Sequence, residues 1–277
     1  MPPDYLIIGH MTKDNTPHGP ILGGTCSYSA LTARRLGRQV AAVTSYGPDI
    51  PALNGLQGIE LAVAPAAQST TFENVYIEGV RHQKWLASSA SLSLTDVPLA
   101  WRAAPIVHLA PLVQEIPPAL CTNFPASLVC ATGQGWLRGQ DEVNNVVYRP
   151  HPDLETWLPC LGVLVLSLAD VFGERAVLTH LLTSVKLGVE TLGPEGCRVY
   201  QQDRVSHIPV RPEVEVDPTG AGDIFAAAFF IRYHATGDPI QAAQFANACA
   251  SLSVTKQGVD SIPTLAQVEA HCQELYG

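Results

Sequence analysis

Short, uninterrupted apolar runs alternate with segments of helical length along this chain, and this rhythm constrains the fold more than any other feature. A strand that is apolar at every position must be buried on both faces, as in a parallel sheet covered by helices. The strand candidates of this kind are residues 5–8, 40–43, 106–109, 128–130 and 162–166. The helix candidates are residues 27–36, 152–158, 170–182, 223–234, 239–255 and 265–276. This order predicts an α/β fold with right-handed crossovers.

One segment, residues 70–88, breaks the rhythm. It alternates in character and carries Glu78-Gly79 between two strand-like arms, which predicts an antiparallel hairpin. This hairpin could either extend the edge of the main sheet or form a flap over a site, and the sequence does not decide between the two. Composition and charge do not shift along the chain, so residues 1–277 are expected to form a single domain.

The composition argues against several classes of function. Apolar residues make up 47% of the chain and charged residues 15%, which is enough apolar surface to form a core. A formal net charge of −9 without any basic run argues against a nucleic-acid partner. The longest uncharged apolar stretch, residues 156–169, is shorter than the roughly 20 residues that a membrane-spanning helix needs. The expected ligand is a small molecule.

Seven cysteines are scattered along the chain and form no C-x-x-C pair. This argues against a zinc site or a disulfide framework and predicts mostly buried thiols in a reducing compartment. The start of the chain lacks the basic and apolar regions of a secretory signal, so a cytoplasmic protein is expected.

The heptapeptide Asp217-Pro218-Thr219-Gly220-Ala221-Gly222-Asp223 stands directly before an apolar helix candidate. Gly220 and Gly222 leave the backbone uncovered where the first N–H groups of a helix lack partners and the helix dipole is positive. Such a cradle suits phosphate and the charge that develops in phosphoryl transfer. Within it, Asp223 is expected to act as a base that takes a proton from a hydroxyl. The alternative is an ordinary loop whose aspartate caps the helix.

Two other glycine-rich phosphate motifs are absent from the sequence. It contains no G-x-x-x-x-G-K-[ST] segment. The first strand is followed by Gly9-His10-Met11-Thr12-Lys13-Asp14 rather than by the G-x-G-x-x-G of a dinucleotide fold.

Through this heptapeptide and the order of its other motifs, the chain resembles the ribokinase-like (PfkB) carbohydrate kinases over nearly its whole length. The resemblance implies a three-layer α/β/α fold with a mostly parallel sheet, and ATP and Mg²⁺ as cofactors. It implies that Asp223 is the catalytic base and that the backbone of Gly220, Ala221 and Gly222 forms an anion hole. The other residues matching family motifs are Thr191, Gly193, Gly196, Thr219 and Asn247 for ATP, Asp14, Gly23, Gly24 and Ser27 for the substrate, and Gly47-x-Asp49.

Three features depart from the family pattern. The family's N-x-x-E motif reads Ser167-Leu168-Ala169-Asp170, and Asp170 is expected to serve the water shell of Mg²⁺ or, alternatively, only to cap a helix. Residues 25–28 stand where the family has an asparagine that contacts substrate. Residues 15–22 are too few for the usual lid strands, so a reduced β lid is expected, with residues 70–88 as its remainder. A monomer is therefore open beside a homodimer.

Residues 134–138 follow a strand candidate and face the expected cleft. Trp136 is expected to pack in the core, and Arg138 is a candidate for contact with phosphates.

The resemblance implies an ATP-dependent kinase that transfers the γ-phosphoryl group to a hydroxyl of a sugar or polyol. The short lid and residues 70–88 and 134–138 resemble the inositol kinases and uncharacterised sugar kinases of the family. A nucleoside kinase is the alternative. A ligand-sensing homologue with weak catalysis is a second alternative, suggested by the altered motif at Asp170.

Overall fold

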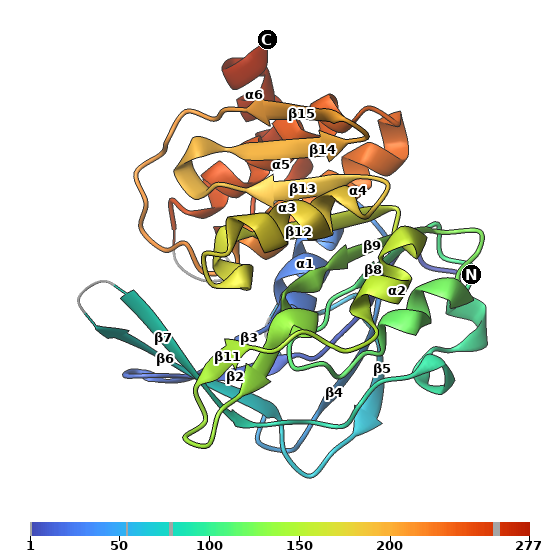
Figure 1. The fold of residues 1–277 in the computed structure, drawn as a ribbon, viewed down its shortest axis with the longest axis vertical. Coiled ribbons are helices and arrows are strands. Elements are labelled where there is room, and N and C mark those ends of the chain that lie inside the picture. Colours follow the sequence, from blue (N-terminus) through green and yellow to red (C-terminus); the bar gives the residue numbers. More distant parts are fainter. Residues whose placement is uncertain (1, 54, 78–79, 257–260) are drawn as a thin grey trace.

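The computed structural model describes residues 2–53, 55–77, 80–256 and 261–277. Within them, nine strands form one sheet in the order β15-β14-β13-β12-β9-β8-β1-β4-β5 (Figure 1). The neighbouring strands pair in parallel from β5 to β13, and β14 and β15 add an antiparallel edge. In chain order these strands are β1 (Tyr5–Ile8), β4 (Val40–Tyr46), β5 (Glu60–Pro65), β8 (Ile106–Leu109), β9 (Leu128–Thr132), β12 (Val163–Ser167), β13 (Gly188–Thr191), β14 (Cys197–Gln201) and β15 (Arg204–Ile208).

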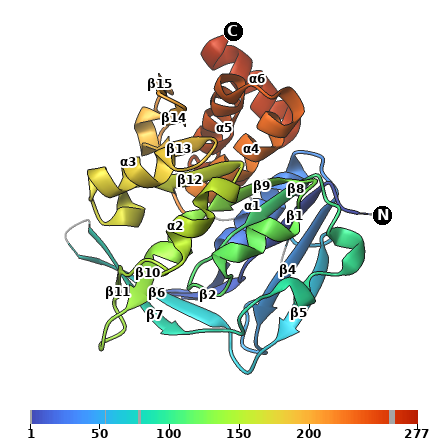
Figure 2. The same cartoon turned by 45° about the vertical axis from the view of Figure 1, so that its right-hand side comes forward.

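Helices cover both faces of this sheet (Figure 2). Side chains of one strand alternate between the two faces, so Tyr5 and Ile7 belong to one apolar core and Leu6 and Ile8 to the other. The predicted three-layer α/β/α fold is therefore confirmed. The first core packs against α1 (Thr25–Arg35), α4 (Ala221–Thr236), α5 (Pro239–Ser253) and α6 (Leu265–Tyr276), and the second against α2 (Leu154–Trp157) and α3 (Arg175–Thr183).

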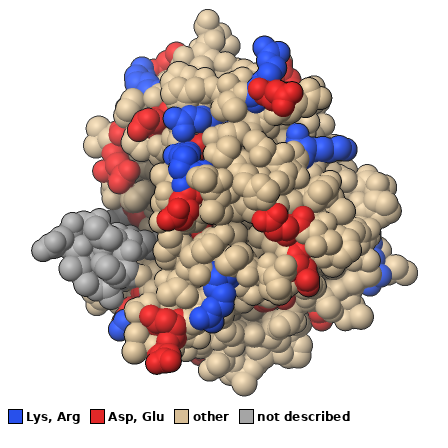
Figure 3. Space-filling model, in the orientation of Figure 1, with Lys and Arg blue, Asp and Glu red and all other residues tan. Residues whose placement is uncertain are grey.

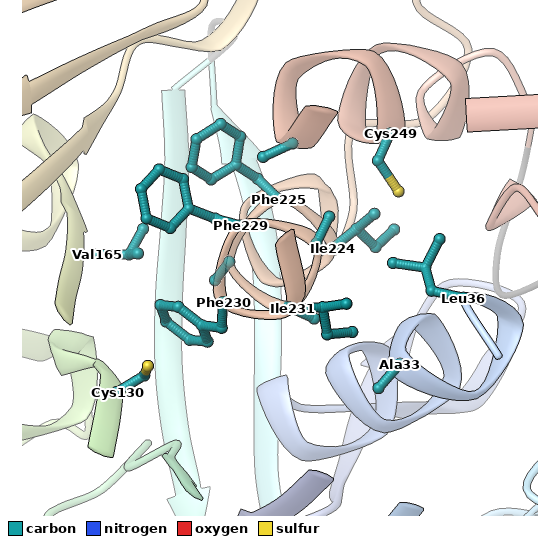
Figure 4. Close-up of a cluster of buried hydrophobic side chains, with 14 of the residues drawn as sticks. Ala33, Leu36, Cys130, Val165, Ile224, Phe225, Phe229, Phe230, Ile231 and Cys249 are labelled. Atoms are coloured by element: carbon teal, nitrogen blue, oxygen red, sulfur yellow. The ribbon is translucent and has the colours of Figure 1, made fainter. Parts of the chain in front are cut away.

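Helix α4 lies at the centre of the first core. All eight residues from Ile224 to Ile231 are buried. Phe229 points toward Val165 of β12, Phe230 toward Cys130 of β9, and Ile231 toward α1 (Figure 4). Because α4 is enclosed on every side, the start of this helix is held in a fixed position relative to the sheet.

A second sheet of four strands among the described residues, in the order β3-β2-β6-β7, stands beside the main sheet (Figure 1). We call it the lid sheet. The expectation that no lid strands fit between Asp14 and Gly23 is wrong, because those two residues themselves belong to strands that turn through Pro17 and His18. The predicted hairpin at residues 70–88 is confirmed as a pair of strands, while its turn residues Glu78 and Gly79 lie outside the described residues. The strands are β2 (Thr12–Thr16), β3 (Gly19–Gly23), β6 (Thr70–Ile77) and β7 (Val80–Ala87).

A further hairpin, β10 (Arg138–Gln140) with β11 (Val146–Tyr148), was not predicted. It docks on the lid sheet, where the Trp85 N–H donates to the Asn144 carbonyl at 2.9 Å. Two antiparallel hairpins therefore flank the same space above the main sheet.

The base of the lid sheet is tied to the main sheet by two polar clusters. Asp49 of the G-x-D motif accepts hydrogen bonds from the Ser69 N–H at 2.8 Å and from Lys13 Nζ at 3.0 Å. The buried His10 lies between Thr70 Oγ1 at 2.7 Å and the Ala90 carbonyl at 2.8 Å. Both clusters fix the residues just before or at the start of β6.

Two predicted helices are shorter than expected. The helix predicted over residues 170–182 is interrupted at Phe172, which has a φ of 53°, and α3 begins only at Arg175. The helix predicted over residues 152–158 is a single turn, α2, that passes into a 3₁₀ turn containing Pro159.

All seven cysteines are free thiols, and the expectation that most of them are buried holds for five of the seven. On the face drawn in Figure 3, acidic and basic side chains are scattered over a mostly neutral surface. In the described part of the chain, no helix combines the length and the apolar character needed to cross a membrane.

A buried carboxylate in β13 predicts a pH dependence of stability. Glu190 is fully buried and accepts hydrogen bonds from Arg175, from the Tyr200 hydroxyl at 2.8 Å and from Arg198 at 3.3 Å. Burial alone would raise its pKa, but the hydrogen bonds from Arg175 and Tyr200 and the charges of the two arginines outweigh burial, so the pKa lies below its ordinary value of 4.5.

This carboxyl holds its proton less firmly in the folded chain than in the unfolded chain. Its stabilising contribution is therefore fully present above pH 4.5 and is lost as the pH falls through the lower pKa of the folded state. We expect Glu190→Gln to lower the free energy of unfolding at pH 7 by about 1–3 kcal/mol and to flatten its fall below pH 4.5. Denaturant titrations at several pH values check this, and parallel pH curves for wild type and variant would contradict it.

Candidate active site

A cleft of about 910 Å³ opens between the main sheet, the lid sheet and the β10–β11 hairpin. Thr132, Ser167 and Thr191, which end β9, β12 and β13, all line it. In open α/β sheets, ligands bind outside the carboxyl ends of the strands. This cleft is therefore the candidate site.

Two helices begin at the cleft, and both begin at a glycine. Gly24 precedes α1 with a φ of 89°, Gly220 precedes α4 with a φ of 78°, and neither helix start has a side-chain cap. By contrast, Asp238 caps α5 by accepting hydrogen bonds from two backbone N–H groups. The first turns of α1 and α4 thus present the backbone itself to the cleft, as anion binding requires.

Tyr28 stands between these two helix starts. A Cβ on Gly220 would lie 2.4 Å from the Tyr28 ring, so only glycine allows the loop to approach α1 this closely. Burial raises the pKa of Tyr28, and the negative charges of Asp14, Asp223 and Asp217 raise it further. The ring therefore lies within the field of three carboxylates at one end of the cleft.

The loop before α4 is shaped by its own backbone. Asp217 Oδ1 accepts a hydrogen bond from the Thr219 N–H at 3.0 Å, and the Ala221 N–H donates to the Pro218 carbonyl at 3.1 Å. The hydroxyl of Ser29 in α1 donates to the Asp223 carbonyl at 3.0 Å. Gly222 and the partly buried Asp223 line the cleft, whereas Ala221 faces a neighbouring pocket.

Asp14 enters the cleft from β2 of the lid sheet. Its Oδ1 accepts a hydrogen bond from Thr12 Oγ1 at 2.8 Å. A Cβ on Gly23 would lie 2.3 Å from the Asp14 carboxylate, which explains the first glycine of the pair. Gly23 and Ser27, which were expected at the substrate site, do not line the cleft, and the fully buried Ser27 hydroxyl donates to the Gly23 carbonyl at 2.8 Å.

Asp170 lines the cleft and also caps a helical turn. Its Oδ2 accepts hydrogen bonds from the Ser167 N–H at 2.7 Å and the Ser167 hydroxyl at 2.8 Å, which cap this helical turn. Its Oδ1 lies 3.9 Å from Arg138 Nη2. In the described part of the chain, no group of three or more His, Cys, Asp or Glu side chains could hold a metal ion.

A smaller pocket of about 160 Å³ adjoins the cleft and shares Thr191, Pro218 and Gly222 with it. Gly193, Gly196 and Asn247 line this pocket, while Thr219 lines the cleft. The Asn247 amide nitrogen donates to the Ile208 carbonyl at 3.0 Å and to the Tyr276 hydroxyl at 3.2 Å. This amide therefore links β15, α5 and α6 in addition to lining the pocket.

Several cleft residues were not predicted. They are mostly polar side chains on the lid sheet and the β10–β11 hairpin, which are brought together by pairing between segments distant in the sequence. On the lid sheet, Gln83 Nε2 donates to Asn74 Oδ1 at 3.1 Å. The unpredicted polar residues that line the cleft are Thr12, Tyr28, Asn74, Gln83, Thr132, Asp141 and Asn145.

Comparison with known proteins places this geometry in context. Residues 168–265 match the family described as pfkB family carbohydrate kinase. Fructokinase-1 of Zea mays is 37% identical over 109 residues, which are 36% of this chain and 33% of that protein, so the match spans about a third of the fructokinase. Cytidine kinase of Thermococcus kodakarensis is 24% identical over 86% of this chain and 91% of its own length.

Solved structures share the fold over the whole chain. A pyrophosphate-dependent myo-inositol-1 kinase that two substitutions convert into a myo-inositol-3 kinase superimposes with a TM-score of 0.80 at 21% identity, covering 98% of this chain and 99% of its own. Arabidopsis thaliana ribokinase, solved with ribose and ATP, superimposes with a TM-score of 0.72 at 19% identity, covering 99% of both chains. These superpositions show the ribokinase-like fold.

Proposed function

Because the chain has the ribokinase-like fold and its residues 168–265 belong to the pfkB family of carbohydrate kinases, we propose that it is a kinase. It transfers a phosphoryl group to a hydroxyl of a sugar or polyol. The observation that carries this proposal is the position of Asp223, which lies in the first turn of α4 and lines the same cleft as Asp14. The proposed base Asp223, the proposed substrate-binding residue Asp14 and the anion cradle at the start of α4 thus face one cavity. The whole of residues 1–277 acts as one domain, with residues 70–88 in its lid.

In the proposed reaction, Asp14 hydrogen-bonds the acceptor and Asp223 takes the proton of the attacking hydroxyl. The uncapped first turn of α4, with Gly220 and Gly222, holds the transferring group where its negative charge develops. Ala221 contributes through the turn that its N–H closes with Pro218. The lid sheet and the β10–β11 hairpin keep water away from the transferring group.

Asp170 lines the cleft and fits Mg²⁺ as one carboxylate in its water shell, since the hydrogen bonds from Ser167 take only its Oδ2. A bound Mg²⁺ would neutralise charge on the donor phosphates. The donor itself would provide the remaining ligands.

The lining of the cleft favours a polyhydroxylated acceptor. Carboxylate, amide and hydroxyl side chains from both hairpins surround the space beside Asp14. Each sugar or polyol hydroxyl is both donor and acceptor, so it matches such a lining. The relative that acts on myo-inositol supports this class, and the cytidine kinase supports a nucleoside as the second candidate.

Asp14 provides a test of acceptor binding. We expect Asp14→Asn to raise the KM for the acceptor by about 10- to 100-fold, the equivalent of losing a hydrogen bond to a charged group, with a smaller change in the KM for the donor. Steady-state kinetics measure both constants. Asp203→Asn, which alters an exposed carboxylate in the turn between β14 and β15 that lines neither cavity, is the matched control. An unchanged acceptor KM in Asp14→Asn would remove Asp14 from the substrate site.

We propose ATP as the phosphoryl donor, with Gly193, Gly196 and Asn247 around its nucleoside in the smaller pocket. Pyrophosphate is a second candidate donor, because the similar myo-inositol-1 kinase depends on it. The two donors differ in their use of the smaller pocket. ATP would place its nucleoside there, whereas pyrophosphate has no nucleoside and does not need the pocket.

A donor and acceptor panel tests the proposed function. Wild-type protein is assayed with ATP and with pyrophosphate against polyols, sugars and nucleosides, and turnover is measured as acceptor-dependent release of ADP or inorganic phosphate. We expect the highest kcat/KM with a polyol or sugar and with ATP. If ligands bind but no acceptor raises turnover above background, the protein is a ligand-sensing homologue instead.

A further inference from the structure

Charge in the cleft is strongly unbalanced. Of the described residues that line it, four are carboxylates, namely Asp14, Asp141, Asp170 and Asp223, and Arg138 is the only lysine or arginine. A phosphoryl donor brings further negative charge into this space. The positive charge of Arg138 therefore offsets both the charge of the four carboxylates and the charge of the donor.

The guanidinium of Arg138 is anchored rather than solvated. Its side chain is 13% exposed, and Nη2 donates to Gln134 Oε1 at 2.7 Å. Gln134 Nε2 in turn donates to Thr25 Oγ1 at 2.8 Å, and Thr25 is the first residue of α1. The chain of contacts connects the guanidinium to the helix start beside the acceptor site.

On its other side, Arg138 faces Asp170. The Nη2–Oδ1 distance of 3.9 Å is beyond hydrogen-bond length, and Asp170 already has its cap contacts with Ser167. The guanidinium thus lies between the acceptor side of the cleft, at α1, and the donor side, at Asp170. In the proposed reaction, the phosphoryl group passes between these two sides.

We propose that Arg138 is a catalytic residue that binds the phosphoryl group during transfer and that Gln134 is its positioning residue. The inference rests on the proposed function. A bond forms between the acceptor oxygen and phosphorus as the bond from phosphorus to the bridging oxygen of the donor breaks, and the hydroxyl proton passes to Asp223. Arg138 exchanges no proton; its planar guanidinium binds the phosphoryl oxygens and opposes their charge.

The test compares Arg138→Met and Arg138→Lys with wild-type protein that has first been shown to phosphorylate an alcohol. We expect Arg138→Met to lower kcat by about 10²-fold or more, with a much smaller change in the acceptor KM, and Arg138→Lys to recover part of the loss. Added guanidinium is expected to restore part of the kcat of Arg138→Ala. Arg149→Met, which removes an exposed arginine just beyond the same hairpin, is the control.

The outcomes separate this inference from the proposed function. If wild-type protein transfers phosphate and both Arg138→Met and Arg138→Lys keep kcat within about threefold, Arg138 is not catalytic while the kinase stands. If wild-type protein phosphorylates no alcohol, the proposed function fails and the role of Arg138 fails with it. If Arg138→Met unfolds, the folded Arg138→Lys variant decides: an undiminished kcat with an acceptor KM raised tenfold would assign Arg138 to acceptor binding and overturn the inference.

A double-mutant cycle tests the role of Gln134. We expect Gln134→Met to lower kcat about 10-fold in wild-type protein and to have no further effect in the Arg138→Met background, because Gln134 acts through Arg138. Multiplicative losses in the double variant would show that the two side chains act independently and would overturn this assignment.

Discussion

Asp223→Asn is expected to lower kcat by at least about 10²-fold while donor binding is retained. The amide cannot take the proton of the attacking hydroxyl, yet it has nearly the same shape. Asp223 stands in the first turn of α4, which is held by its buried core, so the variant is expected to fold normally. Steady-state kinetics together with calorimetric titration of the donor measure the two properties separately.

The matched control for this variant is Asp203→Asn, because Asp203 is an exposed carboxylate in the turn between β14 and β15 and lines neither cavity. Its kcat is expected to equal that of wild type. Loss of donor binding in Asp223→Asn with a nearly unchanged kcat would mean that the aspartate only shapes the loop.

Gly220→Ala and Gly222→Ala are expected to differ in their effects. One lowers both stability and activity, and the other lowers activity alone. A Cβ on Gly220 would meet the Tyr28 ring at 2.4 Å in a left-handed conformation, so this variant is expected to lose about 1–3 kcal/mol of unfolding free energy as well as activity. A Cβ on Gly222 would meet nothing within 4 Å. Gly222→Ala is therefore expected to keep the wild-type stability but to lower kcat/KM for the donor at least about 10-fold, because the methyl group enters the anion cradle.

Thermal or denaturant unfolding and donor kinetics of both variants check these expectations. Full activity in Gly222→Ala would show that the backbone at the start of α4 does not bind the phosphoryl group. Unchanged stability in Gly220→Ala would show that the loop can move away from Tyr28.

The sequence reveals those parts of the fold that burial dictates. Strand β1 is apolar at every position and β8 at every position except the buried His108, because both faces of the sheet are covered, so both strands are predicted to the residue. Strand β2 reads Thr12-Lys13-Asp14-Asn15-Thr16, and only its pairing with β3 and β6 makes it a strand. Pairing between distant segments leaves no local pattern, which is why the lid was expected to be smaller than it is.

The candidate site also contains some residues that the sequence predicts and others that only the fold brings together. Asp223, Gly220 and Gly222 lie in one heptapeptide whose chemistry follows from helix-start geometry, so they could be predicted. Gln83 and Asn145 reach the cleft only because two hairpins dock side by side, and the spacing of residues in the sequence does not predict this docking. Ser27 does not line the cleft, because its hydroxyl turns back to the Gly23 carbonyl, and the sequence of the first turn of α1 does not show which of its residues face the cleft.

The central claim is phosphoryl transfer to an alcohol, and ³¹P NMR of a reaction mixture tests it most directly. With wild-type protein, a donor and an accepted polyol or sugar, we predict a new phosphomonoester resonance that grows in a one-to-one ratio with the released ADP or inorganic phosphate. With Asp223→Asn, no such resonance should appear over the same time. Consumption of the donor without any phosphomonoester, for every alcohol offered, would contradict the account.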